Sequence, residues 1–244
     1  MKEGINMSIT NIILDVIIVF VIISFGFLGL ARGVFKQLVS SVGTVLIFII
    51  AFYLKNPIAK FMSLNLPFWN FNGFAHGLTS LNILFYQLFA FLIVLAILFL
   101  ILEVLIRLAE KIEDALTMTI ILGIPSKILG FIVGLVEGYV LMFIALFILS
   151  LPFWSFDFIN NSKLRPAILE SSPILSKITK NTYNAGVDIY EEIKDTKDNN
   201  DRSKLNLTIT KLLLKYNVID KEYLKELRLH SKLNIPGIDS LIGG

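Results

Sequence analysis

The chain has 244 residues, of which 55% are hydrophobic and only 17% are charged, a balance that excludes an ordinary soluble domain. Its net charge of +3 is spread over mixed signs, which argues against nucleic-acid binding, and the absence of cysteine excludes a disulfide framework and a thiolate metal site. Because 26 of the 41 charged residues follow residue 156, the composition predicts a membrane region followed by a polar tail.

Four apolar runs are long enough to cross a membrane. The hydrocarbon core is about 30 Å thick, so a spanning helix needs about 20 residues that are mostly apolar. We therefore expect an all-α membrane protein whose four transmembrane helices are arranged as two hairpins. The expected spans are about 9–31, 36–54, 82–106 and 124–151.

These spans define the expected domains. A four-helix membrane domain occupies residues 1–156, and a polar helical tail occupies residues 157–244. The run KDTKDNNDRSK predicts a flexible, solvated linker near residues 194–204. Beyond it, LNLTITKLLLKYN and DKEYLKELRL place apolar residues at helical spacing, and Asp220 precedes the second segment in the position of an N-cap.

The first span contains Asp15 about two turns inside and ends in the sequence GLARG. An acid inside a membrane is usually protonated, paired or exposed to water, so Asp15 is either an interface anchor or part of a functional site. Gly29 and Gly33 are four residues apart and share a helix face, which suits close packing against another helix. Arg32 lies between them at the end of the span.

Two similar hexapeptides follow the two expected hairpins, LPFWNF at 66–71 and LPFWSF at 151–156. They contain both tryptophans of the chain, Trp69 and Trp154, and the two spans between them place both on the same membrane face. We interpret these residues as interface anchors, because indole rings favour the headgroup region. A duplicated hairpin with parallel repeats is the alternative.

The third and fourth spans also contain charged residues. Glu103 lies four residues before Arg107, a spacing that suits an ion pair along one helix and a structural role. Glu137 lies near the middle of the fourth span, where the neutral acid is favoured unless a cation or water reaches it. Asp15 and Glu103 lie toward opposite membrane faces, so the sequence does not support an ordered proton relay.

The fourth span has glycine at every fourth position. Gly130, Gly134 and Gly138 in LGFIVGLVEGYV fall on one face of the helix. Lipid supplies little hydrophobic drive for helices to associate, so close backbone approach through small residues supplies much of the packing energy. We expect these glycines to form a groove that packs against a neighbouring helix, with Glu137 beside it.

The aspartate early in span one, the turn LARGVFKQLVS, the long third span and the segment KILGFIVGLVEG together resemble the colicin V production protein (CvpA) family. The resemblance covers roughly residues 11–150. It implies a four-span bacterial inner-membrane protein without a known enzymatic activity, linked to toxin production or secretion and to envelope homeostasis. Similar proteins often have arginine where this chain has Glu137. The residues of this chain that match the family pattern are Asp15, Arg32, Gly33, Gly130, Gly134 and Gly138.

The sequence contains no Walker loop, GxSxG or HExxH motif, so we expect no enzyme. His76 and His230 are isolated, and we expect neither a metal site nor a cofactor. Two hypotheses for the function remain, and in both of them the protein contacts the lipid bilayer as a partner. One is an accessory protein that packs through its glycines against a second copy or a membrane-protein partner. The other is a small transporter or channel that uses Asp15 and Glu137.

The orientation follows from the basic residues of short loops, which favour the cytoplasm. Five lysines and arginines lie on each face, so we use loop length to decide. The turn between spans one and two is very short, whereas a long tail can cross the membrane largely regardless of its charge. Arg32 and Arg107 are then expected in the cytoplasm. The amino terminus, both LPFW segments and the tail are then extracytoplasmic.

Overall fold

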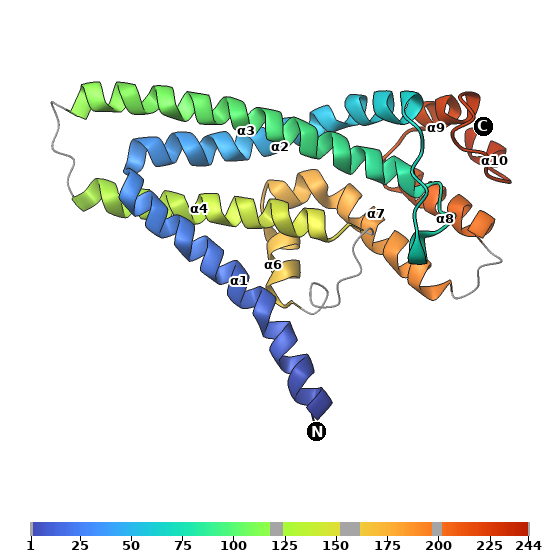
Figure 1. Cartoon of the computed structure of the whole chain (residues 1–244), viewed down its shortest axis with the longest axis horizontal. Helices are drawn as coiled ribbons and strands as arrows, with labels where there is room; N and C mark the ends of the chain where they lie inside the picture. The colour runs from blue at the N-terminus through green and yellow to red at the C-terminus, as the bar shows by residue number, and fades with distance from the viewer. Residues whose placement is uncertain (1, 118–123, 152–161, 197–201, 244) are drawn as a thin grey trace. The chain divides into compact units, whose positions relative to one another are not determined.

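The computed structural model describes residues 2–117, 124–151, 162–196 and 202–243. The described residues contain helices and no strand, which confirms the all-α prediction (Figure 1). The elements are α1 (Lys2–Arg32), α2 (Val34–Asn65), η1 (Gly73–Ala75), α3 (Leu81–Thr117), α4 (Ile124–Leu149), α6 (Leu164–Ser171), α7 (Leu175–Asp195), α8 (Arg202–Lys215), α9 (Lys221–Leu229) and α10 (Asp239–Ile242).

Four of these helices are long and apolar enough to cross a membrane, which confirms the predicted number of spans. The apolar stretches are Ile12–Arg32, Lys36–Asn65, Leu81–Leu108 and Ser126–Leu149. Their arrangement as two hairpins stays a prediction, as do the domain boundary after residue 156 and the linker near 194–204.

The helix that contains the second expected span continues beyond its apolar run. Lys55, Pro57 and Lys60 interrupt the apolar run, yet α2 continues as a helix to Asn65. The continuation is stabilised by packing, because Ala59 and Met62 are buried in a cluster with residues of α3. Tertiary contacts of this kind outweigh local sequence preferences.

The chain divides into two compact units. The first contains α1, the part of α2 up to Ala51, the part of α3 from Leu95, α4 and α6. Within it, α1 packs mainly against α4, and the two helices cross in Figure 1.

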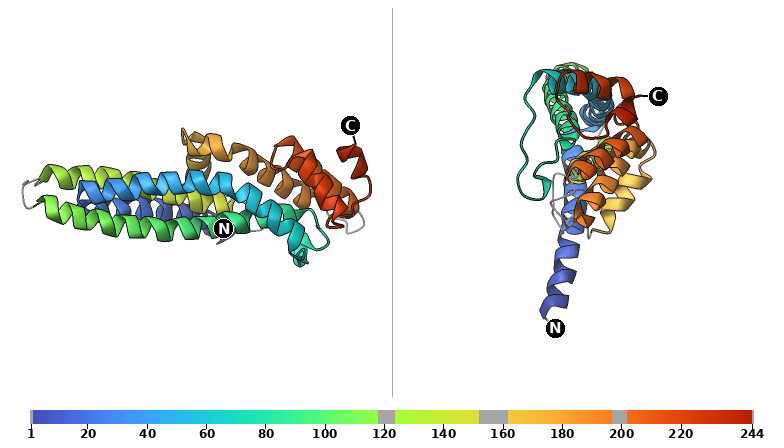
Figure 2. Two further views of the ribbon diagram at one scale, coloured as in Figure 1. Left: turned by 90° about the horizontal axis from the view of Figure 1, so that it is seen from above. Right: turned by 90° about the vertical axis from the view of Figure 1, so that its right-hand side faces the viewer.

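The second unit contains Phe52–Val94 and the helices of the tail from Lys177 onward. Its core joins residues 75–84 to apolar residues of α7, α8 and α9. Figure 2 shows α8 and α9 beside the end of α2 and the beginning of α3. The tail helices therefore share a hydrophobic core with the ends of two membrane-length helices.

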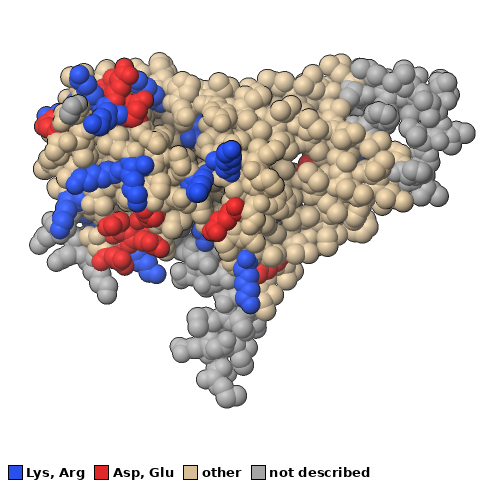
Figure 3. All heavy atoms as spheres, turned by 180° about the vertical axis from the view of Figure 1, so that it is seen from behind, with Lys and Arg blue, Asp and Glu red and all other residues tan. Residues whose placement is uncertain are grey.

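The surface matches a chain that lies partly in lipid. On the face drawn in Figure 3, lysine, arginine, aspartate and glutamate gather over one part and leave a broad area uncharged. Large apolar side chains of the spans are exposed, among them Phe20 at 69% and Leu100 at 66%. In water such a surface would favour aggregation, whereas in a bilayer it faces acyl chains of similar polarity.

Candidate functional site

Glycine backbones make a close contact between α1 and α4. A Cβ atom built on Gly29 would overlap the carbonyl oxygen of Gly130, and one built on Gly130 would overlap the carbonyl oxygen of Gly29. Any larger residue at either position would collide with main-chain atoms, which cannot rotate away. The structure thus brings together glycines from the two motifs that the sequence singled out.

The contact continues along α4. A Cβ on Gly134 would overlap the carbonyl oxygen of Phe25 and lie 3.1 Å from the Cα atom of Gly26. A Cβ on Gly138 would lie 3.0 Å from the Cα atom of Ile22. All three glycines of α4 therefore face α1, one turn after another, as their spacing indicates.

Gly33 has a different position from Gly29. It lies in the one-residue break between α1 and α2 with φ of +84°, a conformation that residues with a Cβ rarely adopt. Its N–H still donates to the carbonyl oxygen of Gly29 at 3.2 Å. Gly33 thus allows the chain to turn sharply between the first two spans.

Glu137 is buried beside this contact, with only 5% of its surface exposed. The Nε2 atom of Gln37 donates a hydrogen bond to one carboxyl oxygen, and the hydroxyl of Ser40 donates to the other at 2.6 Å. Both donors come from α2, so the carboxyl group links α4 to α2. Burial without such donors would be costly for an acid.

The partners of Glu137 belong to a polar stripe that our sequence analysis missed. Gln37, Ser40, Ser41 and Thr44 are all buried, and their spacing of three, one and three residues places them on one face of α2. Ser41 donates to the carbonyl oxygen of Val133 in α4 at 2.9 Å. A polar helical stripe in an apolar span is the signal that would have found them.

A groove of about 480 Å³ opens next to Glu137 and is lined by residues of all four membrane-length helices. Its lining includes the hydroxyl residues Ser40 and Thr44 and the apolar residues Phe99 and Leu100. Glu103 and Arg107 form the expected ion pair of α3, with 2.5 Å between Oε1 and the guanidinium nitrogen. The charged lining residues are Arg32, Lys36, Glu103, Arg107 and Glu137.

Asp15 lies apart from this groove and binds the beginning of α6. Its carboxyl oxygens accept hydrogen bonds from the hydroxyl of Ser162 at 2.5 Å and from the backbone N–H groups of Lys163 and Leu164 at 3.3 and 3.2 Å. The first N–H groups of a helix lack partners within the helix, and an acid near them is favourable. Asp15 therefore caps α6 from a distant part of the chain.

The predicted interface anchors are Trp69, which follows α2, and Trp154, which follows α4. Trp69 is exposed and stacks on Phe85, with ring centroids 6.2 Å apart. Its backbone exchanges two hydrogen bonds with the side-chain amide of Asn82, at 2.7 and 3.1 Å. Trp154 lies outside the described residues.

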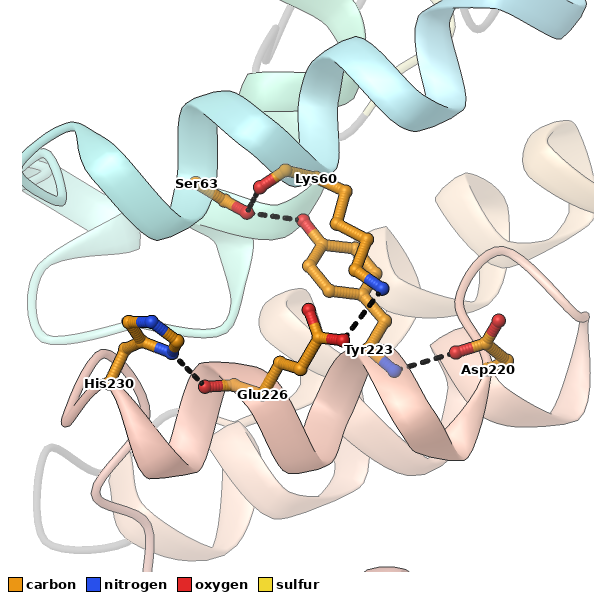
Figure 4. Close-up of polar contacts among 6 residues, drawn as sticks. All are labelled: Lys60, Ser63, Asp220, Tyr223, Glu226 and His230. Carbon is orange, nitrogen blue, oxygen red and sulfur yellow. Dashed lines mark hydrogen bonds and ion pairs between the residues drawn. The ribbon is translucent and has the colours of Figure 1, made fainter.

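The second unit contains a polar contact that the sequence did not reveal. Figure 4 shows α9 beside the end of α2, where the hydroxyls of Tyr223 and Ser63 are 2.6 Å apart. Lys60 forms an ion pair with Glu226 at 3.0 Å. The side chain of Asp220 accepts from the N–H of Tyr223 at 2.6 Å, which confirms the predicted N-cap.

Burial raises the pKa of the Tyr223 hydroxyl to about 12, and the nearby Glu226 adds to this effect while the Ser63 bond opposes it. The tail is held at a second place by Asn206 of α8. Its side-chain oxygen accepts from the N–H of Ser80 at 2.9 Å, and its amide donates to the carbonyl oxygen of Gly77 at 2.8 Å. The tail thus binds both the end of α2 and the segment before α3.

These features define a multi-pass helical membrane protein with a glycine-mediated helix contact and a buried acid beside it. Residues 14–173 match the model of the family described as colicin V production protein, and the chain belongs to this family. The match includes both Asp15 and α6, the two sides of the capping contact. No curated protein and no solved structure matches the chain.

Proposed function

We propose that the protein is a non-enzymatic accessory factor of the bacterial inner membrane that acts in toxin production or secretion, or in envelope homeostasis. Membership of the colicin V production family supports this role. The four membrane-length helices support a place within the bilayer. The tail and the amino terminus are then extracytoplasmic, because the basic residues of the short turn between the first two spans favour the cytoplasm.

The proposed mechanism depends on the glycine contact between α1 and α4. The glycines of α1 and α4 face one another within one chain, so their role is to hold the two helices at a backbone separation that larger residues prevent. Partners, whether a second copy or another membrane protein, then bind through the exposed apolar faces of the rigid bundle. Disruption of the α1–α4 contact would alter these faces without removing any of their side chains.

Crosslinking in the membrane tests this proposal. Photoreactive residues at exposed positions such as Phe20 and Ile97 should capture a defined membrane protein or a second copy. The captured species is identified by mass spectrometry, and the export of a secreted peptide toxin is measured in a strain that lacks the gene. Restoration of export by the wild type but not by Gly134→Leu supports the proposal, and equal restoration by both would contradict it.

Transport is the second candidate, favoured by the polar groove that reaches Glu137 between the spans. The position of Asp15 argues against transport through both acids, because Asp15 binds the beginning of α6 and does not line this groove. Transport through both acids predicts ion or proton flux in liposomes that is lost in Asp15→Asn and in Glu137→Gln. The accessory role predicts no flux above that of empty liposomes.

A further inference from the structure

The groove of the first unit combines a charged mouth with an apolar wall. Its basic residues lie at the ends of membrane spans, because Arg32 is the last residue of the first apolar stretch and Lys36 the first of the second. Arg107 is one residue from the end of the third. Since consecutive spans alternate in direction, these three ends lie at the same membrane boundary.

One cation of this mouth, Arg32, has no acid paired with it among the described residues. Glu103 is paired with Arg107, and Glu137 is buried with both of its oxygens bound by side chains of α2. Arg32 is exposed and makes no hydrogen bond or ion pair within the described part of the chain. The guanidinium of Arg32 is therefore available for a ligand at this mouth.

From this arrangement we propose that the groove binds the headgroup of an anionic phospholipid, with its phosphate at Arg32 and its acyl chains along α3. A guanidinium donates two parallel hydrogen bonds to a phosphate, and basic pockets between membrane helices suit anionic headgroups. Phe99, Leu100 and Ile106 supply the apolar wall on which acyl chains pack. A free phosphate would gain nothing from that wall, so the groove matches an amphiphile better than a soluble anion.

The test is a lipid titration of the purified full chain in detergent, with the bound lipid counted by native mass spectrometry. Phosphatidylglycerol should bind at one molecule per chain, and phosphatidylcholine should bind much more weakly. Arg32→Gln should weaken phosphatidylglycerol binding by about tenfold or more, since hydrogen bonds to charged groups contribute about 1.5–3 kcal/mol. Arg32→Lys should retain part of the binding because it keeps the charge.

Lys127→Gln is the matched control. Lys127 is exposed at the start of the fourth span, on the same membrane boundary, but does not line the groove. Equal weakening by both variants would indicate a general surface attraction and overturn the proposal. Unchanged binding in Arg32→Gln, equal binding of both lipids, or displacement of phosphatidylglycerol by millimolar glycerol phosphate would overturn it as well. Circular dichroism of each variant confirms that the fold is retained.

Discussion

Replacement of Gly134 by leucine tests the close approach of α1 and α4 directly. A Cβ atom at this position would lie 3.0 Å from the carbonyl carbon of Phe25 and 3.1 Å from the Cα atom of Gly26, where ordinary contacts begin at 3.4 Å. Because both partners are main-chain atoms, the collision is relieved only when the helices move apart. The remaining leucine atoms require a larger separation than the Cβ alone.

Two effects lower the free energy of unfolding of Gly134→Leu: overpacking, and the loss of dispersion contacts between the separated helices. Overpacking costs about 1–3 kcal/mol, and a gap of about 0.5–1 Å forfeits a quarter to a half of the dispersion energy of each neighbouring contact. We expect Gly134→Leu to lower the free energy of unfolding by about 2–4 kcal/mol. The assay is unfolding in micelles with a rising mole fraction of dodecyl sulfate, followed by circular dichroism.

Val136→Leu is the control, because Val136 lies in the same turn of α4 and is 51% exposed on its outer side. It adds one methylene at an exposed position, and its expected effect is within about 0.5 kcal/mol, as for other surface substitutions. If the two leucine variants unfold with the same free energy, the glycine contact does not hold α1 and α4 together.

The other predictions concern four further sites. The free energy of unfolding of Glu137→Gln should be within about 1 kcal/mol of the wild-type value, because the buried Oε1 of Gln37 has no partner among the described residues and can accept a hydrogen bond from the new amide. Glu137→Ala should lower it by about 2–4 kcal/mol, and equal effects of the two variants would contradict this reasoning. Tyr223→Phe should cost about 1 kcal/mol. The unfolded tyrosine ionises near pH 10 and the folded one near 12, so the wild type should lose stability between these values, measured by its denaturant midpoint, and a Tyr223→Phe variant with the same alkaline loss would refute the assignment. Asp15→Asn should speed amide hydrogen exchange in α6 while leaving α9 unchanged, and an unaffected α6 would rule out the cap. Ser203→Cys, at an exposed position, should react with an impermeant maleimide in intact cells, and labelling only after lysis would reverse the orientation.

The class of the fold followed from the sequence because membrane helices obey a local constraint. Each span must satisfy its own backbone hydrogen bonds and present apolar side chains to lipid, so length and composition suffice to find it. The helix face shared by Gly130, Gly134 and Gly138 is likewise local, since it depends only on the helical period. The end of α2 has no local signal in the sequence, because the apolar pattern stops at Lys55 while the helix continues through contacts with distant residues.

The candidate site was predictable only in part for the same reason. The sequence identified Glu137 as an acid in an apolar span, but its donors come from residues 97 and 100 positions away in the chain. Asp15 was left between two roles, and its contact with α6 depends on a segment nearly 150 positions further on. No sequence pattern predicts the contact of Tyr223 with Ser63, because the two residues are 160 positions apart in the chain.

By itself, the sequence determined that the chain has four membrane-length helices, a glycine face on the fourth and a polar tail, because these properties depend on residues within a few turns of one another. Only the tertiary structure decided which helix the glycines meet, which donors satisfy Glu137, and that the tail shares a core with the ends of α2 and α3. The physical reason is that lipid-facing helices have weak hydrophobic preference for one another, so their pairing depends on the shape of surfaces and on individual hydrogen bonds between residues far apart in the chain.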